Sequence, residues 1–181
     1  EPGAARGFAG GVAFVDPRMA ALGVRVLADA DTARAALADA GFGEGDAAAW
    51  DALRIRHGVP DGSRDMTPEK ALLLENGFDE LGGVSWDKGC YMGQELTART
   101  KYRALIKRRL VLVTLDGPPP APGTAVMAGD REVGEVKSGV EGAALALLRT
   151  DALESDGAVT ADERALTVHV PDWLRLPEKR A

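Results

Sequence analysis

The chain has little cysteine, and that shortage excludes whole classes of protein. Cys90 is the one cysteine among 181 residues, which rules out a scaffold held by intramolecular disulfides. No apolar run approaches the roughly 20 residues that a membrane-spanning helix needs. Since 45% of the residues are hydrophobic, the chain can bury a real core. We therefore expect a globular protein of the cytoplasm, with no membrane partner.

Histidine is scarce too, which limits the chemistry that the chain can perform alone. His57 and His169 are far from each other in the sequence, and His169 stands in a strand-like TVHV run. No nucleophile–base pair can be identified from them. One cysteine and two histidines also argue against a zinc or iron–sulfur site built within one chain. A cluster is expected only transiently, or shared with a partner or second subunit.

Basic charge is concentrated in one segment of an otherwise acidic chain. The net charge is −6, but residues 88–109 contain seven basic residues against one acid, so this segment carries +6 and the remainder −12. We call residues 88–109 the basic segment. It predicts a local anionic partner such as a phosphate, a carboxylate tail or an RNA backbone. The alternative is a solvated helix face that runs into an edge strand.

The first half of the chain has the pattern of an α+β fold. Near-alternating β-branched residues predict strands at 12–16 and 23–28. A helix is expected to begin at Asp31 as N-cap and to stop at Gly41, and a second to run from the N-cap Asp46 to Gly58.

Beyond these two helices the pattern is less regular. Thr67-Pro68-Glu69 repeats a helix-start signal. A short helix and then a loop are expected over residues 71–86.

Beyond Ile106 the pattern changes to short strands separated by turns. RLVLVTLDG, TAVMAG, REVGEVKSGV, GAALALLRT and ALTVHVPDW alternate or run apolar between GPPPAPG, GD, EG and ESDG. Short strands at this spacing indicate a small β-barrel or sandwich, and we predict a mostly antiparallel barrel over residues 105–175. We place a domain boundary near residue 105, dividing the chain into 1–104 and 105–181.

The motif KGCYMGQE at residues 88–95 surrounds the lone cysteine with polar residues and glycines. Packing cysteines usually lie in apolar runs. Lys88, a nearby Arg99 and a helix beginning around Gly93 would favour the thiolate form of Cys90. The alternative is a structural turn.

Trp50 also admits two interpretations, a core residue or a flat stacking surface for a heteroaromatic ligand.

Four segments together resemble the YgfZ family of folate-binding proteins, whose mitochondrial relatives mature iron–sulfur proteins. They are KGCYMGQELTART, WDALRIRHGVPDG, DPRMAALGVR and GVSWDKGC, and the resemblance runs from the DPR turn to the closing VPDW. The family is similar in fold to the glycine-cleavage T protein. The resemblance implies an incomplete folate-binding α+β body over residues 1–104, followed by the barrel. The start of the chain, EPGAARG without a methionine, agrees with an expected longer N-terminal part.

The resemblance also implies roles for individual residues. Cys90 would be the reactive or cluster-contacting thiol, with Lys88 beside it. The implied cofactor is tetrahydrofolate or a one-carbon derivative, and the residues expected to contact it are Trp50, Tyr91, Gln94, Glu95 and Arg99. One position departs from the T protein, which has a glutamate for pterin recognition where Arg56 stands here. A guanidinium cannot accept the pterin N–H donors, so folate would bind through stacking and its glutamate tail.

Three functions follow from this interpretation. The first is a folate-dependent accessory factor in iron–sulfur cluster assembly or repair, with assembly or client proteins as partners and no catalytic turnover of its own. The second is a folate-dependent aminomethyl- or methyl-type transferase, or a tRNA-modification factor that contacts RNA through the basic segment. The third is a plain binding module. The expected compartment is the bacterial cytoplasm, or the mitochondrial matrix in a eukaryote.

Overall fold

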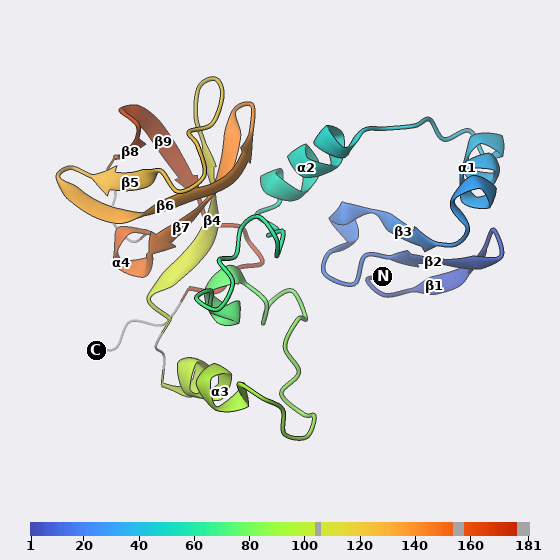
Figure 1. Cartoon of the computed structure of the whole chain (residues 1–181), viewed down its shortest axis with the longest axis horizontal. Coiled ribbons are helices and arrows are strands. Elements are labelled where there is room, and N and C mark those ends of the chain that lie inside the picture. Colours follow the sequence, from blue (N-terminus) through green and yellow to red (C-terminus); the bar gives the residue numbers. More distant parts are fainter. Residues whose placement is uncertain (104–105, 154–157, 177–181) are drawn as a thin grey trace.

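Two separate β-sheets organise the computed structural model, which describes residues 1–103, 106–153 and 158–176 (Figure 1). The first sheet is antiparallel and has the order β1 (Ala5–Phe8), β2 (Gly11–Val15), β3 (Val24–Leu27). The two predicted strands are confirmed as β2 and β3. The polar, glycine-containing β1 was not predicted.

Two helices follow the first sheet, α1 (Ala30–Asp39) and α2 (Ala47–Arg56). The predicted N-cap of the second helix is confirmed, because the Asp46 carboxylate accepts a hydrogen bond of 2.7 Å from the Ala49 N–H. The predicted N-cap of the first is wrong: Asp29 accepts from the Thr32 N–H at 3.0 Å, which places Asp31 inside the first turn. An N-cap must reach an N–H two or three positions ahead, and here Asp29 does so.

The middle of the chain is mostly irregular. The helix predicted to start at Thr67 is wrong, because Glu69 has a φ of 63° and the chain leaves the right-handed helical path after one turn. The short helix expected next is the 3-10 helix η2 (Leu73–Asn76). A similar element, η1 (Ala20–Leu22), precedes β3, and α3 (Gln94–Tyr102) closes the region.

The predicted C-terminal barrel is confirmed as a closed, six-stranded antiparallel barrel of order β4-β7-β6-β5-β8-β9 (Figure 1). The strand β8 was missed because it is short. A single turn, α4 (Thr150–Leu153), follows β7. The strands are β4 (Arg108–Thr114), β5 (Ala125–Ala128), β6 (Arg131–Val140), β7 (Ala143–Arg149), β8 (Val159–Ala161) and β9 (Arg164–His169).

The barrel interior is filled by small aliphatic side chains, among them the fully buried Val111, Val126, Val136 and Leu148. Its outer surface is covered in part by α2, because Ile55 packs in a second buried cluster with side chains of β4 and β7. After β9 the chain returns to α2, where the Trp173 indole donates a 2.8 Å hydrogen bond to the His57 carbonyl. The predicted domain boundary near residue 105 lies outside the described residues and stays a prediction.

A buried ionic network joins α2 to the barrel. The Arg54 guanidinium, 2% exposed, donates to Asp65 at 2.6 Å and to the Ser138 hydroxyl of β6 at 2.7 Å. Asp65 in turn accepts from the Ser138 N–H at 2.9 Å. These bonds satisfy charges that would otherwise be costly to bury. Across the described segments, none of the helices is long and apolar enough to cross a bilayer.

Candidate functional site

Cys90 lies exposed in the loop that leads into α3. Gly93 is the N-cap of α3 and has a φ of 83°, a left-handed conformation that glycine adopts without the cost of a side chain. The predicted helix start near Gly93 is therefore confirmed. The unpaired N–H groups of the first turn favour negative charge nearby, and Cys90 is four residues ahead of the first helical residue.

The two cations expected near Cys90 are engaged elsewhere. The Lys88 ammonium lies 4.6 Å from the centre of the Tyr91 ring, a cation–π contact inside the motif. Arg99 forms an ion pair with Glu95 one helical turn away. Glu95 and Arg99 thus neutralise each other on the surface of α3.

A polar anchor holds α3 against the loop that precedes the motif. The Asp79 carboxylate accepts hydrogen bonds from the Trp86 indole at 2.6 Å and from Lys101 at 3.0 Å. The Lys101 ammonium also lies 3.9 Å from the centre of the Trp86 ring. Burial raises the pKa of Asp79, but the two hydrogen bonds outweigh it and hold that pKa below its usual value. We call Asp79, Trp86 and Lys101 the α3 anchor.

An apolar groove of about 200 Å³ lies beside the motif. It runs between η2 and α3. We call it the η2–α3 groove, and its lining residues are Ala71, Leu72, Leu73, Leu74, Tyr91, Met92, Gly93, Leu96, Thr97 and Thr100. Tyr91 of the motif is half-buried in it, and Gln94, also half-buried, begins the helix that forms one wall.

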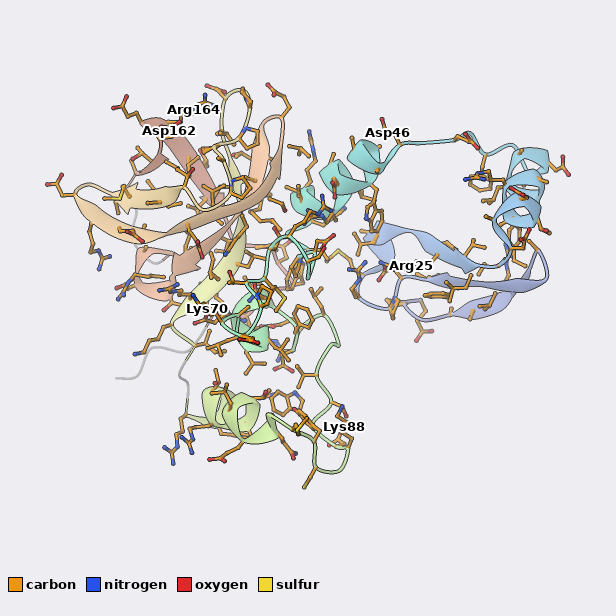
Figure 2. All side chains as sticks on the ribbon, in the orientation of Figure 1. Arg25, Asp46, Lys70, Lys88, Asp162 and Arg164 are labelled. Carbon is orange, nitrogen blue, oxygen red and sulfur yellow. The ribbon has the colours of Figure 1, made fainter. Side chains whose placement is uncertain are left out.

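Trp50 lies on α2, away from the motif. Its side chain is 38% exposed, and the Arg25 guanidinium lies 5.7 Å from the ring centre. Figure 1 shows α2 between the two sheets and α3 on a different side of the molecule, and Figure 2 separates Arg25 from Lys88 in the same way. The structure therefore does not bring the two groups of expected site residues together.

The carboxylate next to Trp50 in the sequence is held by two arginines. The neighbouring carboxylate, Asp51, accepts hydrogen bonds from Arg64 at 2.5 Å and from Arg54 at 3.0 Å. The Arg64 hydrogen bonds lower the pKa of Asp51 to about 2. Arg56 is exposed and has no acceptor to offer. Arg56 therefore cannot take the part of an acceptor for the pterin N–H groups.

The basic segment is not a continuous basic surface. Arg109 is 3% exposed and pairs with Glu80 at 2.6 Å, so its expected place on the surface is wrong. Lys101 pairs with Asp79 and Arg99 with Glu95. Because three of its cations are neutralised within the fold, the structure gives no support to RNA contact.

Within residues 1–103, 106–153 and 158–176, no group of three or more His, Cys, Asp or Glu side chains could hold a metal ion.

Sequence reasoning missed the residues that position the site, namely Arg54, Asp65, Asp79 and Trp86. Arg54 is one of two arginines in α2, and nothing local marks it as the buried one. For Trp86 a signal existed, since GVSWDKGC carries a tryptophan four residues ahead of Cys90.

Known proteins resemble this chain both in the barrel and over most of its length. Residues 107–176 match the CAF17 C-terminal beta-barrel domain. The iron-sulfur cluster assembly factor IBA57, mitochondrial, of Mus musculus is 38% identical over 87% of this chain and 46% of its own. The Homo sapiens protein of that name is 36% identical over 93% of this chain and 49% of its own. The Yarrowia lipolytica homolog is 28% identical over 93% and 37%.

The chain spans about half the length of the curated relatives it matches. It carries a CAF17-type C-terminal β-barrel over residues 107–176, and across most of its length it is similar to the mitochondrial iron–sulfur cluster assembly factors named IBA57.

Proposed function

We propose that this chain acts in iron–sulfur cluster assembly or repair, and that Cys90 presents its thiol to a cluster held by a partner protein. One observation carries the proposal: the lone cysteine is exposed, in a loop directly ahead of the N-terminus of α3. The similarity to the assembly factors named IBA57 supports the pathway.

The number of available thiols determines how Cys90 can act. A cluster typically takes four cysteine thiolates, and this chain offers one. Cys90 therefore completes or receives a cluster whose other ligands belong to a second molecule. The partners are assembly or client proteins, and the compartment is the one where those proteins work, the mitochondrial matrix or the bacterial cytoplasm.

Folate binding is a second, separable part of the proposal. Trp50 supplies a partly exposed aromatic face for stacking, and the Arg25 guanidinium beside it is already paired with Asp16 at 2.6 Å. No step at Cys90 depends on folate. A fluorescence titration with tetrahydrofolate tests this part: binding should weaken in Trp50→Ala, and equal affinity in the two proteins would remove Trp50 from the site.

The test of the main proposal is complementation in cells that lack their own relative of this protein. The full-length protein with Cys90→Ser should fold but fail to restore the activity of an iron–sulfur enzyme. Ser85→Ala, an exposed change in the same loop, is the matched control and should restore it. Full activity with Cys90→Ser would overturn the proposal.

A further inference from the structure

Met92 differs from the other methionines of the chain in its access to solvent. The chain has four methionines, and Met92, in the loop ahead of α3, is 100% exposed. Met19, Met66 and Met127 are each half-buried. The Met92 sulfur is therefore the one that a small molecule in solution reaches from most directions.

The fold shields the three other sulfurs in different ways. Met19 packs against a buried apolar cluster. Met127 lies in the barrel sheet, where β5 pairs with β6 on one side and β8 on the other. Met66 follows the buried Asp65 in the loop after α2. Each of these side chains gives a solvent molecule only partial access to its sulfur.

A methionine thioether reacts with a hydroperoxide in one two-electron step. With hydrogen peroxide, the sulfur attacks one oxygen and the O–O bond breaks. The proton of the attacked oxygen passes to the departing one, which leaves as water, and the sulfur keeps the other oxygen as a sulfoxide. The peroxide is reduced and the sulfur is oxidised. No acid or base of the protein takes part, so the rate depends on how freely the oxidant reaches the sulfur.

Oxidation at Met92 would change a defined part of the surface. Met92 lines the η2–α3 groove together with Leu73 and Leu96. A sulfoxide replaces an apolar side chain by a polar one, so the mouth of the groove would gain a strong hydrogen-bond acceptor. Because Met92 is fully exposed, this change costs no contact of the buried core.

We propose that Met92 is a reversible oxidation site. Hydroperoxides form its sulfoxide, and methionine sulfoxide reductases, of which each acts on one sulfoxide epimer, remove it. In the reduction two thiols become a disulfide and the sulfoxide oxygen leaves as water. The modification makes the mouth of the η2–α3 groove polar and leaves the fold intact. This site goes beyond the proposed function, since neither step uses the Cys90 sulfur.

The rates of oxidation test the site directly. The folded chain is treated with hydrogen peroxide for a series of times, and peptide mass spectrometry follows the gain of one oxygen at each methionine. Met92 should oxidise several-fold faster than Met19, Met66 or Met127. In concentrated urea the four rates should converge, because the shielding by the fold is lost. Equal rates in the folded chain would overturn the proposal.

Variants and the reverse reaction complete the test. Met92→Leu should abolish the fast oxidation, whereas Met127→Leu, the matched control, should keep it. Chains oxidised at Met92 alone should unfold at the same urea concentration as untreated chains, and the two reductases together should restore Met92 without unfolding. A lower unfolding midpoint, or a sulfoxide that the reductases do not accept, would contradict the proposal. Cys90→Ser should oxidise at Met92 as fast as wild type, so this modification and the thiol function can fail separately.

Discussion

Cys90 and Arg54 lie in opposite surroundings, one exposed and one buried. Cys90 is exposed in the loop ahead of α3. Arg54 is buried, and its partners come from the 59–65 loop and from β6. A change at Cys90 should therefore alter function and leave the fold intact, whereas a change at Arg54 should alter the fold first.

Arg54→Met should destabilise the protein strongly. The variant leaves Asp65 buried without the guanidinium of Arg54. Removing one member of a buried ion pair typically lowers the free energy of unfolding by about 3–5 kcal/mol. Urea denaturation followed by circular dichroism measures the loss. The control is Arg34→Met, whose guanidinium is 66% exposed and pairs only loosely with Asp31 and Glu44; its cost should stay below about 1 kcal/mol. Similar losses in both variants would contradict the assigned role of the buried network.

Asp51 should make the stability of the fold depend on pH in the acid range. The Arg64 hydrogen bonds lower the pKa of Asp51 from an ordinary 3.8 to about 2, so on acidification the unfolded chain takes up its proton first. This contribution to the free energy of unfolding is complete above pH 3.8 and is lost as pH falls towards 2.

Asp51→Asn removes that contribution, so its free energy of unfolding should fall less steeply than that of wild type between pH 5 and about 2. Arg64→Gln should flatten the curve too, because Arg64 binds both Asp51 and Asp61. Urea unfolding at several pH values gives both curves. Parallel curves for wild type and Asp51→Asn would show that the ion pair does not form in solution.

Among the elements, α3 has the most direct bearing on the site. Its start at Gly93 and the α3 anchor together determine where the Cys90 loop lies. The helix has few apolar side chains of its own facing the body, and much of its surface is exposed. We therefore expect the α3 anchor to contribute much of the free energy that holds α3 in place.

Trp86→Ala should loosen the loop without unfolding the protein. It removes the indole donor to Asp79 and the ring under the Lys101 ammonium, interactions worth on the order of 1–3 kcal/mol locally. Hydrogen exchange of residues 87–95 should accelerate, while exchange in the barrel strands should not change. Trp50→Ala, a tryptophan change on α2 instead of in the α3 anchor, serves as the control. Unchanged protection of the loop would mean that other contacts hold α3.

Elements with local signals could be predicted from the sequence. The Asp46 cap, the start of α3 and the alternating barrel strands depend on residues a few positions apart. The buried pairs could not be predicted, because Ser138 is 84 residues from Arg54 and Glu80 is 29 from Arg109. The prediction of a helix at Thr67 was wrong for a different reason. The sequence carries a helix-start signal there, but the left-handed backbone of Glu69 prevents the helix from continuing.

On the scale of the whole molecule, the chain presents two separate surfaces. One is the Trp50 face of α2, tied to the barrel by the Arg54 network, and the other is the Cys90 loop with the η2–α3 groove. Figure 1 shows them on different parts of the molecule. The resemblance to a folate-binding family predicted both sets of residues but not their separation, which depends on how distant segments pack.

The central claim is that Cys90 contacts a cluster whose other ligands come from outside the chain. The most direct measurement is anaerobic titration with a [2Fe–2S] cluster carried by glutathione, followed by visible circular dichroism. In the expected exchange the Cys90 sulfur binds iron, one glutathione leaves, and the thiol proton passes to the departing glutathione thiolate. Wild type should give a new, saturable visible signal that Cys90→Ser lacks and Ser85→Ala keeps. The same signal in Cys90→Ser, or none in wild type, would contradict the account.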